Sequence, residues 1–210
     1  AWGGTRIEPW TPPEGFASVP ALAKIYEQVQ LSDPRTDLHK QRAEKLFAET
    51  AAWVNESKKA VSSESLVPLM PKFPDEFLPP KDQQVPVVLY NGMLNPVVPF
   101  KIKGAIWYQS ESNHGEGKLY TEKTKALVEG WRKVWNNPDL FYFYVQIAPY
   151  QYGNESPYIV PEFWEAQTAA QAIPGTGMIV TTDISDLKDI HPKNKKEVGR
   201  RLSLLALNKA

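Results

Sequence analysis

The 210-residue sequence contains no cysteine, so no disulfide bond stabilises it and no thiolate can bind a metal. It has no apolar run of about 18 residues, the length that a membrane-spanning helix needs, and we expect no membrane partner. Lys and Arg together number 24, Asp and Glu together also number 24, and the formal net charge is zero. Because no stretch is rich in basic residues, nucleic acid is not an expected partner.

Short motifs of several enzyme classes are also missing. The three histidines, His39, His114 and His191, do not have the spacing of metal ligands. The sequence has no phosphate-binding loop, no dinucleotide fingerprint and no Gly-x-Ser-x-Gly nucleophile elbow. We therefore expect neither a metal nor a cofactor. The hydrophobic content of 42% indicates a globular chain, and the 19 prolines indicate proline-rich loops.

The apolar pattern predicts helices in the first third of the chain and alternating strands and helices from residue 103 onward. The first helix is expected over residues 17–30. A longer one follows Asp33-Pro34, with Leu46 and Phe47 on its apolar face, and residues 68–86 form an irregular, proline-rich connection. The later elements are expected as strand 103–108, helix 119–135, strand 140–148, helix 163–172, strand 177–182 and helix 193–208. This alternation predicts an α/β fold whose parallel sheet is covered by helices on both faces.

A polar cluster follows the first of these strands, from Gln109 to Asn113. In parallel sheets, active sites gather at the carboxyl ends of the strands. Amide N–H groups of Gln109 or Asn113 at such an end can stabilise a developing oxyanion. A polar turn whose side chains satisfy its own backbone is the alternative interpretation. Gly3-Gly4 is a third, weaker signal, because adjacent glycines let backbone N–H groups approach a ligand closely.

A second polar cluster follows the last predicted strand and ends in His191-Pro192. A histidine just before a helix lies at the positive end of the helix dipole, which favours the neutral ring that a general base requires. A nearby aspartate, Asp183, Asp186 or Asp189, can fix the ring tautomer. An exposed loop in which one acid caps the helix explains the same pattern.

Several longer blocks occur in a fixed order along the chain. They are Trp2-Gly3-Gly4-Thr5 with Glu8 and Trp10, Leu89-Tyr90-Asn91-Gly92-Met93 with Pro96, Lys103 to Gln109 with Glu111-Ser112-Asn113, Gly130-Trp131-Arg132 with Trp135, Val145 to Pro149, Trp164-Glu165-Ala166-Gln167, and Asp189-Ile190-His191-Pro192 with Asn194 and Lys195. Together they resemble the sialate O-acetylesterase group of the SGNH hydrolase superfamily over nearly the whole length.

The resemblance implies a flavodoxin-like, three-layer fold and the serine-dependent hydrolysis of acetyl esters on sugars, with an acetylated carbohydrate as substrate. His191 is then the general base and Asp189 the orienting acid, with Asp183 and Asp186 as alternatives. The oxyanion hole and substrate pocket would be formed by Gly3, Gly4, Gln109, Glu111 and Asn113. A secreted or periplasmic location is implied by the family.

Three departures from the family pattern stand out. The family's nucleophile lies in a GQSNM block upstream of the glycine block, and this sequence does not contain it. We therefore expect residues 1–210 to be the C-terminal part of one SGNH-type catalytic domain, N-terminally incomplete and associated with the missing segment. Ser110 stands where the family has glycine, and we do not expect it to be the nucleophile. Lys188 occupies the place of the acid in the superfamily's Asp-x-x-His spacing.

Two other functions remain open from the sequence. One is an acetylxylan esterase with the same chemistry, and the other is a non-catalytic, carbohydrate-binding remnant of the fold. Aromatic residues that can stack on sugars, or equally pack in the core, are Tyr108, Tyr150, Tyr152, Tyr158 and Trp164. The sequence does not choose between sialic acid and xylan as the acetylated sugar.

Overall fold

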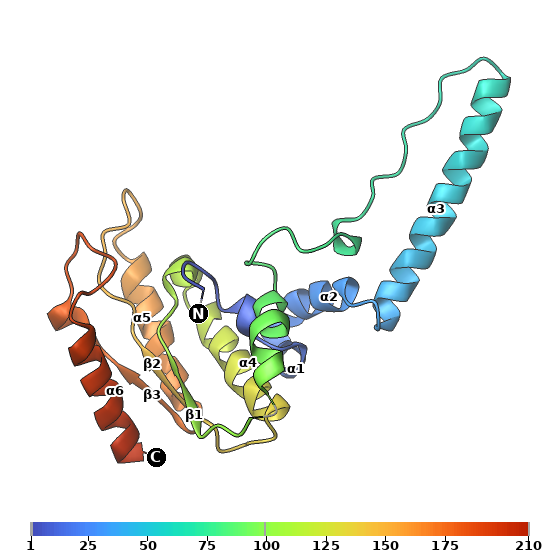
Figure 1. The fold of residues 1–210 in the computed structure, drawn as a ribbon. Coiled ribbons are helices and arrows are strands. Elements are labelled where there is room, and N and C mark those ends of the chain that lie inside the picture. Colours follow the sequence, from blue (N-terminus) through green and yellow to red (C-terminus); the bar gives the residue numbers. More distant parts are fainter. Residues whose placement is uncertain (1, 99, 210) are drawn as a thin grey trace. The chain divides into compact units, whose positions relative to one another are not determined.

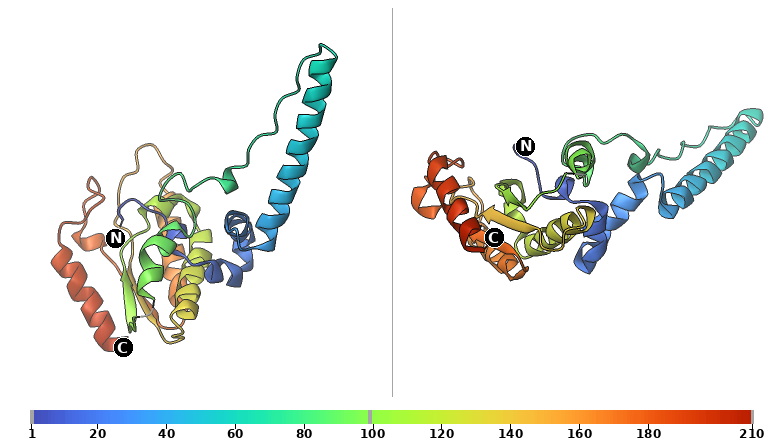
Figure 2. Two further views of the ribbon diagram at one scale, coloured as in Figure 1. Left: turned by 45° about the vertical axis from the view of Figure 1, so that its right-hand side comes forward. Right: turned by 60° about the horizontal axis from the view of Figure 1, so that its bottom comes forward.

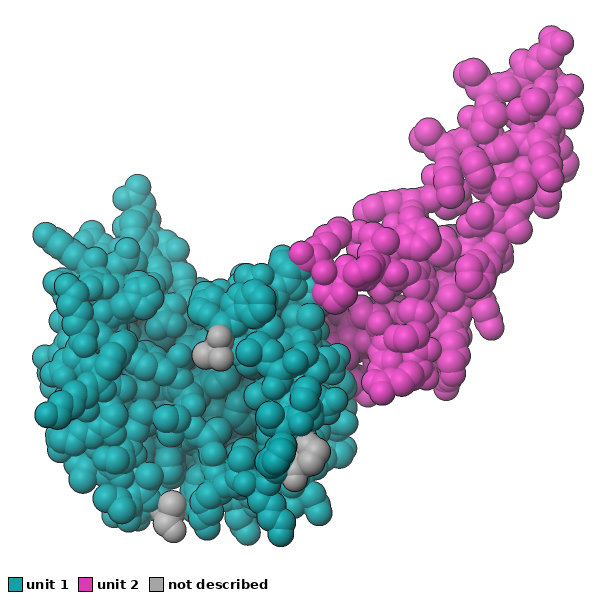
Figure 3. Space-filling model, viewed as in Figure 1, with its two compact units in different colours: residues 1–23, 82–210 teal, residues 24–81 magenta. Residues whose placement is uncertain are grey.

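The structure is a computed structural model, and it describes residues 2–98 and 100–209. Contacts between Cα atoms divide the chain into two compact units (Figure 3). The first comprises residues 1–23 and 82–210, and the second comprises residues 24–81. The inclusion of residues 1–210 in one catalytic domain stays a prediction.

A three-stranded parallel sheet forms the centre of the first unit (Figure 1). Its strands are β1 (Gly104–Trp107), β2 (Phe141–Val145) and β3 (Thr176–Ile179), in the spatial order β1-β2-β3. Ile106 pairs with Phe143, and Phe143 pairs with Gly177. The expected parallel α/β fold is confirmed, and the strand ends differ from the predicted ranges by a few residues.

Helices cover both faces of this sheet (Figures 1 and 2). Because side chains alternate along a strand, Tyr142 and Tyr144 of β2 face α4 (Leu119–Val134) and α5 (Ile159–Ala169) in one apolar core. Phe143 and Val145 face the opposite way and pack against α6 (Lys195–Lys209). The result is the expected three-layer arrangement.

The prediction of a single helix over residues 17–30 is wrong. The structure has α1 (Pro13–Ser18) and α2 (Ala23–Ser32), with a break at Val19 and Pro20. Val19 is extended, with φ −118° and ψ 102°. A proline ring clashes with a helical conformation of the residue before it, so Pro20 explains the break.

Single turns of helix complete the described secondary structure. A π-helical turn spans Tyr90–Leu94, and 3₁₀ turns span Glu8–Trp10, Pro20–Leu22, Asp75–Phe77, Asn95–Val97, Glu111–Glu116, Ala170–Ala172 and Thr182–Ile184. In the described residues, no helix has both the length and the apolar character that crossing a bilayer requires.

The second unit is built on α3 (Asp37–Ser62), whose N-cap Thr36 accepts a hydrogen bond from the backbone N–H of His39. An irregular segment returns along this helix, as the prolines predict. Trp53 donates to the carbonyl of Pro68 (2.9 Å), and the His39 ring lies edge-on to Phe77 with centroids 4.7 Å apart.

The apolar face predicted for α3 is only partly buried. Leu46 is buried, but Phe47 is 68% exposed. Several apolar side chains of the returning segment are exposed too, and they are Leu66, Val67, Leu69, Met70 and Phe73. The residues of this unit therefore cover little of their own apolar surface.

Candidate functional site

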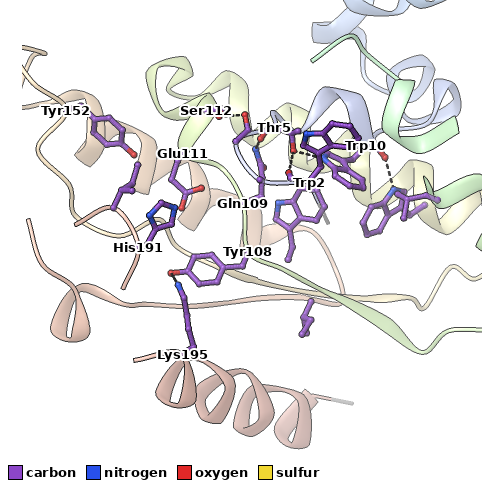
Figure 4. Close-up of a pocket in the computed structure, with 17 residues that line it drawn as sticks. Trp2, Thr5, Trp10, Tyr108, Gln109, Glu111, Ser112, Tyr152, His191 and Lys195 are labelled. Carbon is purple, nitrogen blue, oxygen red and sulfur yellow. Dashed lines mark hydrogen bonds between the residues drawn. The ribbon is translucent and has the colours of Figure 1, made fainter. Parts of the chain in front are cut away.

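A cavity of about 770 Å³ opens in the first unit, at the carboxyl ends of β1 and β3 (Figure 4). Its wall combines the N-terminal glycine segment, the turn after β1 and the loop that leads to α6. Residues far apart in the sequence thus meet at one place, as the strand-end argument predicts. The predicted site residues on this wall are Gly3, Gly4, Gln109, Glu111 and His191.

Asn113 takes a different place from the one predicted. Its side chain is 1% exposed and does not line the cavity. Its Oδ1 accepts from the backbone N–H of Ile7 (3.0 Å), and its Nδ2 donates to Glu8 (3.0 Å). Because both ends of the amide are used inside the protein, Asn113 fixes the N-terminal segment and does not reach a ligand.

Gln109 lines the cavity, but its N–H groups are already donated. Nε2 hydrogen-bonds the carbonyl of Thr5 and, at 3.3 Å, Oδ1 of Asn113. Its Oε1 is buried and has no hydrogen-bond partner among the described residues. An oxyanion needs donors, so Gln109 fits that predicted role only if one of these bonds breaks.

The N-terminal glycine segment differs from Gln109 in that its backbone N–H groups are not engaged within the described residues. Gly4 has φ +70°, a conformation that glycine adopts without strain. Its carbonyl accepts from Ser112 Oγ (2.9 Å) and from Gln84 Nε2 (2.8 Å), which fixes the local backbone. In the described part of the chain, the N–H groups of Gly3 and Gly4 have no acceptor. They remain free to donate to a ligand in the cavity.

A buried ion-pair network holds this segment in place. Lys123 of α4 donates to Glu8 (2.6 Å) and to Glu116 (2.7 Å), and Glu8 also accepts from Asn113. Burial raises the pKa of Glu8, but the charge of Lys123 and hydrogen bonds from Lys123 and Asn113 outweigh it and lower the pKa below its ordinary value. Glu8 is therefore an ionised carboxylate in the core.

Ser110 is buried behind the cavity wall and is not placed as a nucleophile. Its hydroxyl lies 2.5 Å from the hydroxyl of Tyr120 and accepts from Gln167 at 3.5 Å. Its backbone has φ 153° and ψ −8°, a region that side chains disfavour. Glycine adopts such a conformation without strain, which fits the glycine that the resemblance implies at this position.

We expect Ser110→Gly to be more stable than Ser110→Ala. Both variants lose the hydrogen bond to Tyr120, but only glycine relieves the backbone strain, a difference of about 1–3 kcal/mol. Chemical denaturation of the two variants measures the difference in free energy of unfolding. Equal stability would show that the backbone at this position is not strained.

His191 is exposed, and its side chain reaches the cavity. It does not lie directly before a helix as predicted, and Pro192 is not in the first helical turn, because α6 begins only at Lys195. Asn194 caps α6 by accepting from the N–H of Glu197 (3.1 Å). The predicted influence of the helix dipole on the ring is correspondingly weaker, since the effect falls off beyond the first turn.

None of the three aspartates hydrogen-bonds the His191 ring in the described structure. Asp189 accepts from the backbone N–H of His191 (2.9 Å), which is a turn contact. Asp186 accepts from the backbone N–H of Lys188 (2.9 Å). Hydrogen bonds from Arg201 to Asp183 lower the pKa of that carboxyl to about 2. The role of Asp189 as orienting acid stays a prediction.

Glu111 is the acid that shares the cavity with His191. In Figure 4 its carboxylate points toward the imidazole. Burial, followed by the negative charge of Glu111, raises the pKa of both Tyr108 and Tyr152. An ionised carboxylate only accepts hydrogen bonds, so Glu111 cannot donate to an oxyanion and instead suits a ring N–H or a sugar hydroxyl.

Aromatic side chains form much of the remaining wall. Trp107 packs edge-on between Trp10 (6.0 Å between centroids) and Trp131 (5.8 Å). Of the aromatic residues proposed for sugar stacking, Tyr108 and Tyr152 line the cavity. Thr5 and Lys195 also line the cavity; both occur in the blocks that carry the resemblance, but the sequence assigns neither a role.

Comparison with known proteins identifies a family and related sequences for more than half of the chain. A family model described as carbohydrate esterase, sialic acid-specific acetylesterase matches residues 84–207. The chain is 35% identical over 135 residues to the sialate O-acetylesterase of Mus musculus and 31% identical to that of Homo sapiens. These matches cover 56% of the chain, 25% of the mouse protein and 26% of the human protein.

A solved structure is similar as well. It is a carbohydrate acetylesterase from Xanthomonas citri, 37% identical, with a TM-score of 0.58. The match covers 61% of this chain and 31% of that one. By comparison, the chain spans about a quarter of the length of the mouse and human relatives. Residues 24–81, the second unit, lie outside the region that the family model matches.

Proposed function

Because the chain belongs to the carbohydrate esterase family of sialic acid-specific acetylesterases, we propose that it forms part of an enzyme that hydrolyses acetyl esters on sugars. The observation that carries the proposal is the meeting of His191 with the Gly3-Gly4 segment at one cavity of about 770 Å³. A base and backbone N–H donors at one cavity are what acyl transfer to and from a serine requires.

The proposed reaction has two steps. A serine hydroxyl attacks the acetyl carbon and passes its proton to His191, while the N–H groups of Gly3 and Gly4 hold the oxyanion. His191 then protonates the departing sugar oxygen, which leaves an acetyl-serine. Water, deprotonated by His191, attacks this ester, and acetate is released as the serine recovers its proton. Asp189 or Glu111 stabilises the imidazolium.

We propose that the serine comes from a segment outside this sequence. Ser112 lines the cavity, but its hydroxyl donates to Gly4. Ser185 lies beside His191 in a smaller pocket, and its hydroxyl donates to the carbonyl of Thr181 (2.6 Å). Within the described residues, the His191 ring has no serine partner. The relatives are about four times the length of the matched region, which supports a further segment.

The free edge of β1 is the proposed contact for that segment. β1 is an outer strand, so its outward backbone groups are unpaired in the described sheet. Ile106 on this strand is 71% exposed and also lines the cavity. A parallel strand added here would end at the cavity that Ile106 and His191 both line, because active sites gather at the carboxyl ends of parallel strands. It would bring its serine to the cavity.

The test compares residues 1–210 alone with the longer protein that includes the predicted GQSNM block. We expect the longer protein to release acetate from an aryl acetate, and the 210-residue chain to show no activity above background and a tendency to aggregate. Full activity of a soluble, monomeric 210-residue chain that reacts with a serine-directed phosphonate would contradict the proposal. Mass mapping of the labelled residue would then identify the serine.

The same proposal covers the setting of the enzyme. Its substrate is an acetylated carbohydrate, as the names of the related esterases suggest. Its main protein contact is the serine-bearing segment, with which the chain forms one catalytic domain. The secreted or periplasmic location expected from the family is part of the proposal.

A further inference from the structure

Lys195 brings a positive charge to the cavity wall. It is the first residue of α6, and its ammonium lies 4.4 Å from the centroid of the Tyr108 ring and 3.4 Å from the Tyr108 hydroxyl (Figure 4). Both residues line the cavity. Burial, followed by the charge of Glu111, raises the pKa of Tyr108 to about 12. The tyrosine is therefore neutral and orients the ammonium without neutralising it.

No carboxylate of the described chain pairs with this ammonium. Of the other cations near the start of α6, Lys193 lies 3.8 Å from Asp189, Arg200 and Arg201 pair with Glu197, and Lys196 does not line the cavity. Among the described residues, the ammonium of Lys195 contacts the ring and the hydroxyl of Tyr108. The start of α6 adds a partial positive charge at the same place. This part of the wall attracts an anion.

The opposite charge on the wall, that of Glu111, forms no ion pair with Lys195 among the described residues. Glu111 points toward His191 in Figure 4, whereas the ammonium of Lys195 lies at Tyr108. A substrate with a carboxylate and several hydroxyls can thus place the carboxylate at Lys195 and offer a hydroxyl to Glu111. A neutral sugar offers Lys195 hydroxyl oxygens but no carboxylate, so it cannot form the stronger charge-assisted pair there.

We propose that Lys195 is the specificity-determining residue that binds the carboxylate of an acidic sugar, so that the enzyme favours acetylated acidic sugars over neutral ones. The inference rests on the proposed esterase function and deepens it. It would decide between an acidic substrate and a neutral plant polymer, which the sequence leaves open.

The test uses the longer protein and pairs of substrates that differ only in charge. One pair is an O-acetylated sialic acid and its methyl ester, and a second pair is an acetylated uronic acid and its methyl ester. We expect the wild type to favour the acid over the ester about tenfold in kcat/KM, as for a charge-assisted hydrogen bond, mainly through KM. The preference should narrow as ionic strength rises. The two pairs show which acidic sugar is favoured.

Lys195→Met keeps the apolar stem beside Tyr108 and removes the charge, so we expect the acid-to-ester ratio to fall to about one. Lys195→Arg should retain most of the preference. Lys196→Met is the matched control, because Lys196 is an exposed neighbour that does not line the cavity. A wild-type ratio near one, or a ratio that Lys195→Met leaves unchanged, would overturn the inference.

A binding measurement separates this inference from the proposed function. Calorimetry gives the affinity of the wild type and of Lys195→Met for free, non-acetylated sialic acid and for its methyl ester. If the longer protein hydrolyses no aryl acetate, the proposed function fails, but the affinity ratio still tests Lys195. A stronger affinity for the acid that disappears in Lys195→Met supports the inference, and equal affinities contradict it.

Discussion

Replacing His191 with alanine is expected to lower kcat for aryl acetate hydrolysis by the longer protein by about 10³-fold or more. The reason is that His191 is the proposed base, and no other described histidine lines the cavity wall. Without it the serine hydroxyl cannot lose its proton during attack, nor can the leaving sugar oxygen gain one. Steady-state kinetics, with circular dichroism to confirm folding, measure the effect.

Two further variants serve as comparisons. Asp189→Asn and Glu111→Gln each remove one acid that can orient the ring, and both should cost less than His191→Ala, because neither group transfers the proton. The larger loss identifies the orienting acid. Near-normal hydrolysis by a well-folded His191→Ala protein would contradict the assignment of the base.

Replacing Lys123 with methionine is expected to lower the free energy of unfolding by about 3–5 kcal/mol. Lys123 is 4% exposed and is the cation between Glu8 and Glu116. Its removal leaves the carboxylate of Glu8 charged, buried and without a cation, and the N-terminal segment loses its anchor. Chemical denaturation at about pH 7 measures the loss.

The control for Lys123 lies on the same helix. Lys125 and Glu129 are partly exposed and 3.9 Å apart, so Lys125→Met should change stability by less than about 1 kcal/mol. The double variant Lys123→Met/Glu8→Gln should recover part of the loss, because it removes the unpaired charge. A loss for Lys123→Met no larger than that for Lys125→Met would contradict the importance of the network.

The pH dependence of this effect has a definite sign. In the wild type the folded-state pKa of Glu8 lies below its ordinary value of 4.5. The ionised carboxylate therefore stabilises the fold at pH values above 4.5, and this stabilisation is lost as the pH falls through the folded-state pKa. Without Lys123, burial dominates and raises the pKa of Glu8, and protonation then favours the folded state. The difference in free energy of unfolding between the wild type and Lys123→Met should therefore become smaller as the pH falls from about 7 to about 4.

The sequence predicts the layers of the fold well, because its apolar pattern reflects them directly. The run from Phe141 to Val145 is apolar on both faces, as a strand between two helical layers must be. Pro20 is a local signal for a break in the helix, but the apolar periodicity on either side of it favours one continuous helix. The exposure of Phe47 was not predictable, because periodicity shows that residues share a face but not what covers it.

The location of the candidate site at the strand ends can be predicted from the sequence, but the contacts of its individual side chains cannot. Gln109 and Asn113 are both amides in one turn, and the sequence gives them the same role. Only the contacts distinguish them, since Asn113 binds Ile7 and Glu8 in the interior while Gln109 reaches the cavity. Likewise, the spacing of Asp189 and His191 permits a ring contact, but the turn directs the carboxylate to the backbone.

The positions of the three histidines make the chain suitable for magnetic resonance. His39 touches Leu31 and Phe77 in the second unit, His114 stacks on Tyr152 in the first, and His191 lies in the cavity. Isotope labelling of histidine alone therefore gives one ring signal from the second unit and two from the first, of which His191 lines the cavity and His114 stacks on the cavity residue Tyr152. Ligand entry would perturb the signal of His191, and loosening of the second unit would perturb that of His39, so one spectrum reports on both units independently.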